Sequence, residues 1–523
     1  MPSTPYFLQA GPLRVHYENG FLRYITHDDA EILRMIYFAV RDHNWQTAAF
    51  TITDEHIDQT ADSFRISYVW HTDDLGIQLT GQVAIEGDLN GTISVDFYGK
   101  ALNSFQKNRI GLCVLHPIDG VIGQPAQVID PNGHVASGHF PVSINPYQPF
   151  ISIQTLRWRP ASGTTWQLDF SGEVFETEDQ RNWTDDSFKT YSTPSTQPFP
   201  VAVAPGDEFR QRVVFERSQP ILSAPAAVHE LSDRHKLLTD LTPTIPRLGV
   251  GQWAGGPPLT ETEAKLLREL RLSHLRTDIF FRLPNWQTLL ADAIADAQKL
   301  AVPLELAVFF NNHPLQELQL LQHVLEANPV AVQSMLIFQA DTLRTSNELL
   351  QTLVPVLRTE WSGQAGLGLV RSEMKIGGGT DDNFVEWNRH RFAVDRVDFV
   401  TYSINPQIHA FDDLTLLENI AGQTETALSA QQLGDGKPIH ISPITLLPRY
   451  TTLAGTATER LTAPADPRQT TEFGADWTRR SLTALANAGV ASVTYYQTHG
   501  PGGLVEGDTV HPVFHALKDR RST

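Results

Sequence analysis

Residues 303–327, PLELAVFFNNHPLQELQLLQHVLEA, combine a short apolar run with a helical pattern directly after it. The run at 303–310 is almost continuously apolar, which is typical of a strand buried on both faces of a parallel sheet. Residues 314–327 have the apolar spacing of an amphipathic helix. Because a strand followed by a helix is the building unit of parallel α/β folds, the stretch predicts one such unit.

The same alternation continues on both sides of this unit, from residue 247 to residue 523. We expect strands at residues 247–251, 274–280, 303–310, 334–339, 374–378, 397–404, 438–444 and 492–498. The expected helices are 260–272, 286–300, 314–327, 346–358, 414–432 and 476–488. Thr260 and Glu263 have the spacing of a helix capping box. Eight such units predict a TIM barrel, with the helix in HPVFHALKD, residues 511–519, closing the ring.

Residues 1–219 have a different pattern, in which short apolar or alternating runs are separated by Gly, Asn and Asp. Examples are LRVHY, FRISYVW, IQLTGQVAI, GTISVDFYG and FRQRVVFE. Many short strands and few helical periods predict a large antiparallel β-sandwich. Its size is similar to the supersandwich domains of carbohydrate-active proteins, which is an analogy. Residues 220–246 are rich in Pro, Ser and Thr at their ends and are interpreted as a linker with a short helix.

The amino-acid composition limits the classes of partner that this protein is expected to bind. The 523 residues carry 59 acidic and 40 basic side chains, a formal charge of −19, which disfavours nucleic acids and anionic membranes. No apolar run is long enough to span a membrane, and no secretory signal is recognised at the start. The one cysteine, Cys113, lies in an apolar run and is interpreted as a buried strand residue. We expect a cytoplasmic protein, and the charge indicates nothing specific about its substrate; a homo-oligomer is possible.

Residues 175–191, FETEDQRNWTDDSFKTY, are the densest charged stretch of the chain. Such a stretch is compatible with a solvated loop. Three large rings lie among the charges, however, and a segment that buries rings while presenting acids and bases is a plausible wall of a polar pocket. The candidate substrate-binding residues in it are Glu178, Asp179, Arg181, Asn182, Trp183, Asp185 and Lys189.

The same stretch resembles the signature of bacterial D-apionate lactonases. Further resembling stretches follow in order along the chain, among them NRIGLCVLHP, GGGTDDNFVEWNR, NPQIHAFDD and SVTYYQTHG. The resemblance implies a β-sandwich followed by a TIM barrel, and hydrolysis of a small sugar-derived lactone. One departure is TYYQTHG, with Gln497 and His499, where the family is expected to have a glutamate in T-Y-x-E-T-T-G. The family is also expected to continue past the HAL helix into a small β-rich domain that this sequence does not include.

Chemistry in a TIM barrel takes place at the C-terminal ends of the strands. His409 lies three residues before Asp412, and a histidine oriented by a carboxylate is a usual general base. Glu386 is a second candidate base, although it is equally compatible with a helix first turn. Asp278 follows Arg276 on the same face of a strand, so a plain ion pair is an alternative there.

Other polar residues are candidates for binding the substrate. Arg181, Lys189 or Asn388 could stabilise an oxyanion, and Gln497 and His499 lie at the last strand end. Arg109 and His116 flank an apolar strand; they either line the same pocket as the charged stretch or pair and cap locally.

No cofactor or metal is expected, because H-x-H, H-E-x-x-H and C-x-x-C are absent from the sequence. His313, His409, His440 and His499 could still converge from different strands. No G-x-S-x-G is present to indicate a nucleophilic serine.

Two other functions remain open. A glycoside hydrolase would need two carboxylates across one pocket, drawn from Asp278, Asp341, Glu386 and the neighbours of Gln497. The fourth expected strand is followed by Asp341 one position late, and the seventh ends without an acid, which weakens this reading. A non-catalytic carbohydrate-binding protein is the third possibility, motivated by Gln497.

Overall fold

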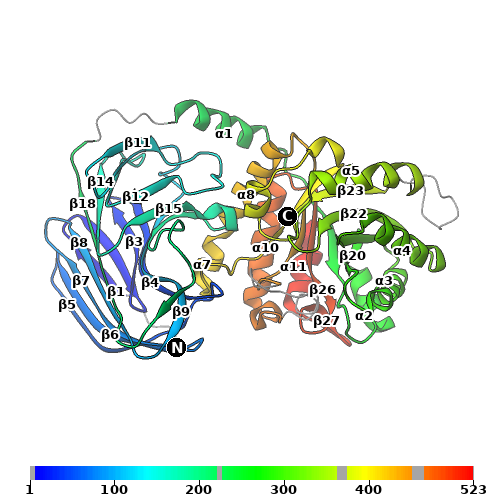
Figure 1. Cartoon of the computed structure of the whole chain (residues 1–523), viewed down its shortest axis with the longest axis horizontal. Coiled ribbons are helices and arrows are strands. Elements are labelled where there is room, and N and C mark those ends of the chain that lie inside the picture. Colours follow the sequence, from blue (N-terminus) through cyan, green and yellow to red (C-terminus); the bar gives the residue numbers. More distant parts are fainter. Residues whose placement is uncertain (1–5, 221–226, 362–373, 450–463, 522–523) are drawn as a thin grey trace. The chain divides into compact units, whose positions relative to one another are not determined.

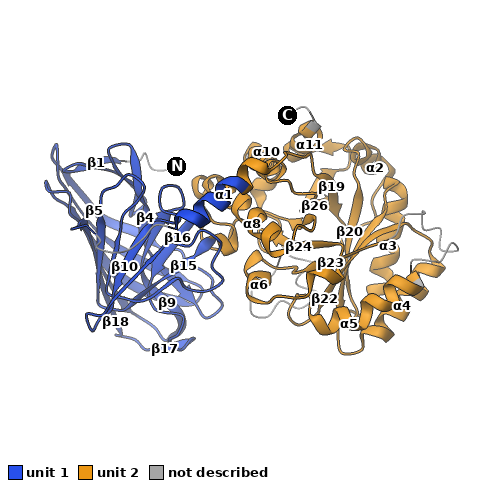
Figure 2. Ribbon diagram, turned by 90° about the horizontal axis from the view of Figure 1, so that it is seen from above, with its two compact units in different colours: residues 1–180, 186–236 blue, residues 181–185, 237–523 orange. Residues whose placement is uncertain are grey.

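The computed structural model describes residues 6–220, 227–361, 374–449 and 464–521. The chain forms two compact units, shown in different colours in Figure 2. The first contains Met1–Gln180 and Asp186–Lys236, and the second contains Arg181–Asp185 and Leu237–Thr523. The short segment Arg181–Asp185 therefore belongs to the second unit, although the sequence on both sides of it belongs to the first.

The described part of the first unit is built from two antiparallel sheets (Figure 1). One sheet has the order β1 (Tyr6–Ala10), β2 (Leu13–Glu18), β3 (Phe21–His27), β4 (Ala30–Asp42), β9 (Phe105–Pro117), β16 (Ser187–Tyr191), β15 (Phe175–Asp179) and β12 (Phe150–Ile153), with β17 (Val201–Val203) also pairing with β9. The other has the order β11 (Val135–His139), β10 (Pro125–Ile129), β13 (Thr155–Trp158), β14 (Trp166–Ser171), β18 (Glu208–Arg217), β8 (Ile93–Ala101), β7 (Ile77–Gly87), β6 (Phe64–Asp74) and β5 (Thr51–Gln59).

Several strands of this unit, such as β6 and β7, alternate between buried and more exposed positions over their full length. Their inward side chains form one apolar core, in which the ring of Trp70 lies 4.8 Å from that of Phe38 and 5.5 Å from that of Phe97. Period-two alternation is the pattern that predicts antiparallel strands with one buried face. The predicted antiparallel β-domain is confirmed. Helix α1 (Val228–Asp240) follows it.

The second unit is a closed parallel barrel (Figure 1). In its described residues the strands are β19 (Arg247–Gly251), β20 (His274–Phe280), β21 (Leu304–Phe310), β22 (Val332–Gln339), β23 (Lys375–Gly379), β24 (Phe399–Ile404), β25 (Ile439–Ile444) and β26 (Ser492–His499). Strand β19 pairs in parallel with both β20 and β26, which closes the ring. The predicted TIM barrel is confirmed. A short hairpin, β27 (Gly503–Glu506) and β28 (Thr509–Val510), extends β26 and was not expected.

The helices cover the outside of the barrel. They are α2 (Glu261–Arg268), α3 (Trp286–Leu300), α4 (Pro314–Ala327), α5 (Asn347–Val356) with the π-turn η2 (Leu357–Trp361), α6 (Phe384–Arg389), α7 (Asp413–Glu418), α8 (Ile420–Leu433), α10 (Glu472–Asn487) and α11 (Pro512–Lys518). Short 3-10 turns are η1 (Gln180–Trp183), η3 (Val394–Arg396), η4 (Pro467–Thr470) and η5 (Asp519–Arg521). Thr260 and Glu263 form the predicted capping box at the start of α2.

Two helical segments differ from the expectation. The single helix expected at residues 414–432 is divided into α7 and α8 at Asn419. Helix α6 has too few residues for a period to be visible and was not among the expected helices, but the helix first turn considered for Glu386 is observed there.

Candidate functional site

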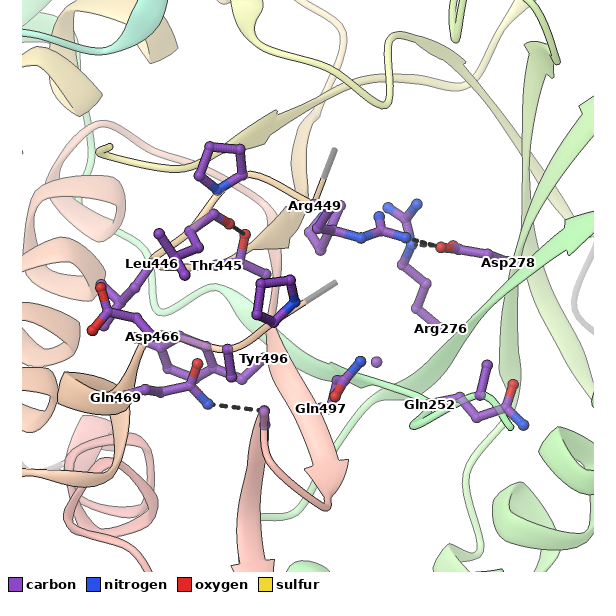
Figure 3. A pocket seen from close by; sticks show the side chains of 18 residues that line it. Gln252, Arg276, Asp278, Thr445, Leu446, Arg449, Asp466, Gln469, Tyr496 and Gln497 are labelled. Atoms are coloured by element: carbon purple, nitrogen blue, oxygen red, sulfur yellow. Dashed lines mark hydrogen bonds and ion pairs between the residues drawn. The ribbon is translucent and has the colours of Figure 1, made fainter. Parts of the chain in front are cut away.

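A cavity of about 70 Å³ lies at the C-terminal ends of the barrel strands (Figure 3). Residues from the ends of β19, β20, β25 and β26 and from the loops after them line it, which is where TIM barrels carry their active sites. The polar side chains in its wall are Gln252, Arg276, Asp278, Thr445, Arg449, Asp466, Gln469 and Gln497. Since one water needs about 10–15 Å³ on this measure, the cavity has room for a small polar molecule.

Two guanidinium groups and two carboxylates form a charge cluster at this cavity. The Nε of Arg276 donates to Asp278 at 2.9 Å, and one of its Nη atoms donates to Asp381. Arg449 donates to Asp278 as well, and its other Nη atom lies 3.4 Å from both oxygens of Asp381. Figure 3 shows the contact between Arg449 and Asp278. The cluster is neutral in sum and is nearly closed to solvent, because the side chains of Asp278 and Asp381 are 8% and 0% exposed.

The charges of this cluster determine the ionisation of Asp278. Burial acts to raise the pKa of the Asp278 carboxyl group, but the charges and hydrogen bonds of Arg276 and Arg449 outweigh it and lower the pKa below the usual value. Asp278 is therefore a carboxylate throughout the neutral pH range. Its partner Arg276 is held from a third side by Ser442, whose Oγ accepts a hydrogen bond of 3.1 Å.

The three glutamines of the wall are not equivalent. Gln252 has both ends of its amide engaged, since it donates to the carbonyl of Leu289 at 3.1 Å and accepts from Thr277 at 2.6 Å. Gln469 donates to the carbonyl of Gly502 at 2.8 Å. The side-chain amide of Gln497 has no hydrogen bond to any residue that the structure describes. Gln497 thus offers a donor and an acceptor to a molecule in the cavity.

His409 pairs with a different carboxylate from the one that its sequence neighbourhood indicates. Its Nδ1 lies 2.5 Å from Oδ2 of Asp185, and its ring packs edge-on against Trp183 at 5.2 Å. Asp412 instead caps α7, because its side chain accepts from the backbone N–H of Thr415 at 3.0 Å. A His–Asp pair exists in the barrel unit, but neither residue is among those lining the cavity.

The other expected barrel residues lie away from the cavity wall. Glu386, in the first turn of α6, accepts from Arg344 at 2.9 Å. Asn388 donates to the side-chain oxygen of Asn182 at 2.9 Å. The Nε2 of His499 lies 2.8 Å from the carbonyl oxygen of Pro257, and its ring packs on Trp253.

The segment Arg181–Asp185, the centre of the charged stretch, is bound to the helices of the barrel. Arg181 is fully buried and forms an ion pair of 3.1 Å with Glu425 of α8. Asn419 donates to Asp185 at 2.6 Å at the point where α7 ends and α8 begins. Gly422 of α8 has room for no side chain, since a Cβ there would lie 2.4 Å from the carbonyl oxygen of Thr184. These contacts attach the segment to the second unit, and they account structurally for the buried charges of Arg181 and Asp185.

The candidates on the strands of the first unit have local partners. Glu178 and Lys189 face each other across β15 and β16 and form an ion pair. Asp179 accepts from the backbone N–H of Asn145 at 3.0 Å. The guanidinium group of Arg109 packs on the rings of Trp45 and Phe199, 5.2 and 5.0 Å from their centroids.

His116 is a core residue of the first unit, with no exposed surface. Its Nε2 lies 3.0 Å from the hydroxyl of Thr190, and its ring packs against Phe140 and Trp158. Burial lowers the pKa of His116 to about 3. A group that is this inaccessible and neutral is a packing residue rather than a base at neutral pH.

This pKa predicts a pH-dependent loss of stability. An unfolded histidine takes up a proton below about pH 6.5, whereas folded His116 does so only near pH 3, so the native state is disfavoured as pH falls between these values. The variant His116→Gln keeps a hydrogen-bond partner for Thr190. Between pH 8 and pH 5, its free energy of unfolding is expected to fall by about 2 kcal/mol less than that of the wild type. Urea unfolding of both proteins at the two pH values measures this, and an unchanged pH dependence would contradict it.

Among the residues that are described, no three or more His, Cys, Asp and Glu side chains are grouped to hold a metal ion. No helix in the described ranges is long and apolar enough to cross a membrane.

The sequence predicted the ion pair of Asp278 with Arg276, but not the other charged residues around this pair. The spacing of Arg276 and Asp278 on one strand correctly indicated an ion pair. Arg449 and Asp381 come from other strand ends, 171 residues from Asp278 and 105 residues from Arg276 respectively. Their positions after expected strands were the only local signal for them.

Comparisons with known proteins agree with this architecture. Residues 1–220 match the N-terminal domain of D-apionate lactonase, and residues 248–522 match its TIM barrel domain. The D-apionate lactonase of Brucella anthropi is 29% identical over 529 aligned positions, an alignment that covers 97% of this chain and 84% of that protein.

Similar solved structures are more distant. The β-glucuronidase of Ruminococcus gnavus is 7% identical over 93% of this chain and 69% of that chain, with a TM-score of 0.35. The catalytic domain of an endo-β-1,4-mannanase from Bacillus sp. JAMB-750 is 10% identical over 55% of this chain and 88% of that chain, with a TM-score of 0.33. The two domain matches together cover nearly the whole sequence, and the chain belongs to the D-apionate lactonase family of hydrolases.

Proposed function

We propose that this protein hydrolyses a small sugar-derived lactone, D-apionolactone or a close relative, in the cavity at the mouth of the barrel. The observation that carries the proposal is the contact of a buried, ionised carboxylate, Asp278, with the guanidinium group of Arg449 in the cavity wall. A base and an oxyanion stabiliser are the two groups that lactone hydrolysis requires. The small cavity volume fits a single sugar ring.

In the first step Asp278 accepts a proton from a water molecule as the water oxygen attacks the lactone carbonyl carbon. The carbonyl carbon becomes tetrahedral and its oxygen becomes an oxyanion. An N–H group of Arg449 donates to this oxyanion. When Arg449 turns from Asp278 toward this oxygen, the carboxylate loses one of the two cations that lower its pKa. Binding of the substrate therefore makes Asp278 a stronger base at the moment when a base is needed.

In the second step the intermediate collapses and the bond from the carbonyl carbon to the ring oxygen breaks. The leaving alkoxide takes the proton that Asp278 had accepted, which restores the carboxylate and releases a hydroxy acid. No other reactant is consumed. The side chain of Gln497 is suited to bind a ring hydroxyl as both donor and acceptor.

The direct test measures acid release by the purified protein at constant pH. The substrates are a panel of aldonolactones that includes D-apionolactone, with aryl glycosides beside them. Acid release from a lactone above the uncatalysed rate is expected. Cleavage of the aryl glycosides together with inert lactones would overturn the proposal in favour of a glycoside hydrolase, and no turnover of either class would favour a binding role.

Arg449→Met is expected to lower kcat by about a hundredfold, because removal of a single oxyanion donor costs about 10²–10³ in kcat. KM should change less, since the contact forms mainly in the transition state. Arg480→Met is the matched control, because Arg480 pairs with Asp476 on the exposed face of α10. An Arg449→Met enzyme with the wild-type kcat would show that another group stabilises the oxyanion.

A further inference from the structure

A second layer of polar side chains lies inside the barrel and does not line the cavity. It contains His274, Glu305, Ser334, Ser442 and Thr494, from five different strands, and each is at most 2% exposed. Barrel interiors are usually filled with branched apolar side chains. A buried carboxylate is costly unless hydrogen bonds and opposite charges compensate for it, so Glu305 needs an explanation.

Glu305 is held by several partners in this layer. The hydroxyl of Ser442 donates to its Oε1 at 2.7 Å, and the hydroxyl of Ser334 donates to its Oε2 at 3.1 Å. The Nε2 of His274 lies 3.7 Å from Oε1. Burial acts to raise the pKa of Glu305, but the neighbouring histidines, Ser442 and Arg276 lower it below the usual value. Glu305 therefore carries a negative charge inside the barrel.

One hydroxyl group connects this charge to the cavity. Ser442 has a single hydroxyl hydrogen, and when it points to Glu305 the Ser442 oxygen can accept from Arg276 at 3.1 Å. Without Glu305, the hydrogen could point toward Thr494, whose Oγ1 lies 3.0 Å away. Glu305 thus orients the Ser442 hydroxyl group so that its oxygen accepts the hydrogen bond that Arg276 donates.

Arg276 is held on three sides as a result. Asp278, Asp381 and Ser442 accept from its Nε, Nη2 and Nη1 respectively. Of these three acceptors, only Ser442 is neutral. Together with Asp381, Ser442 holds the guanidinium plane when Asp278 changes its charge during the reaction.

We propose that Glu305 is a positioning residue, which acts through Ser442 to fix Arg276 and thereby the orientation of the Asp278 carboxylate toward the substrate. This inference rests on the proposed lactone hydrolysis at the cavity. Displacing a catalytic base by a fraction of an ångström reduces the rate of the chemical step more than it reduces substrate binding.

The test compares Glu305→Gln, Ser442→Ala, Ser442→Thr and the double variant Glu305→Gln/Ser442→Ala. We expect Glu305→Gln and Ser442→Ala each to lower kcat by about tenfold to a hundredfold, with KM within about twofold of the wild type. The double variant should lose no more than Ser442→Ala alone, because both substitutions break the same link. Ser442→Thr keeps the hydroxyl and should retain the wild-type kcat.

Leu325→Ala is the control for general destabilisation, since Leu325 is a buried residue of α4 outside both polar layers. It should lower the unfolding temperature and leave kcat unchanged. Losses in kcat that add up in the double variant, or that Leu325→Ala reproduces, would assign Glu305 a merely structural role and overturn the inference.

The two proposals fail in different ways. A wild-type enzyme that hydrolyses lactones, with Glu305→Gln at the wild-type kcat, overturns the positioning role and leaves the proposed function standing. A wild-type enzyme that is inert toward every lactone overturns both. Should Ser442→Ala give no folded protein, Glu305→Gln and Ser442→Thr decide the question by themselves.

Discussion

Asp278→Asn is expected to lower kcat for lactone hydrolysis by about 10²–10⁴-fold, the range that a positioned general base contributes. Asparagine has nearly the same shape and can still accept hydrogen bonds from Arg276 and Arg449, but it cannot take a proton from water. The loss should therefore be in the chemical step. Initial rates of acid release at saturating lactone measure it.

The pH dependence separates Asp278 from the other candidate bases. Because Arg276 and Arg449 lower the pKa of Asp278, the wild-type rate should show no acid limb between about pH 5 and pH 8. A fall in rate near pH 6.5 would instead identify an imidazole as the base. His409→Ala would then be the informative variant, with Asp185 as the residue that orients the imidazole.

Asp341→Asn is the matched control for this substitution. Asp341 also follows a barrel strand, but its side chain is 67% exposed and it pairs with the exposed Arg282. We expect a wild-type kcat from this variant. Equal losses in both variants would mean that the effect is not specific to the cavity, and a loss in Asp341→Asn alone would revive the glycoside hydrolase reading.

The barrel could be predicted from sequence because its physical cause is local. A strand buried on both faces must be apolar throughout, and an outer helix must be apolar on one side only, so the two patterns alternate visibly along the chain. The expected strand at residues 303–310 and the observed β21 (Leu304–Phe310) differ by one residue. The division between α7 and α8 was not visible, since the side chain that binds Asn419 there is Asp185, 234 residues away.

The site could be predicted only as a set of strand ends. Local spacing correctly paired Arg276 with Asp278, which are neighbours on one strand face. Local spacing also suggested His409 with Asp412, but an Asp just before a helix is equally suited to cap it, and Asp412 accepts from the N–H of Thr415 as the cap of α7. The closure of the barrel determines which charged residues from different strands come into contact. The periodicity of the sequence does not predict these contacts.

Glu425→Ala is expected to lower the free energy of unfolding of the barrel unit by about 3–5 kcal/mol. Arg181 has no exposed surface, and the variant removes the carboxylate that forms an interior ion pair with its guanidinium group. Urea unfolding followed by tryptophan fluorescence measures the change, since Trp387 and Trp477 are both buried in this unit. The transition of the first unit should be treated separately, because two units need not unfold together.

Two further variants decide whether the loss of the ion pair causes this decrease in stability. Asp476→Ala breaks the exposed pairs with Arg479 and Arg480 and should cost no more than about 1 kcal/mol. The double variant Arg181→Met/Glu425→Leu removes both charges and should recover most of the stability that Glu425→Ala loses, because apolar side chains of similar size can replace a buried ion pair. If the double variant is as unstable as the single one, the cost comes from lost packing between Arg181–Asp185 and α8. The segment Arg181–Asp185 would then be held mainly by close packing against α8. Gly422, which allows the close approach to Thr184, would be the critical residue for this packing.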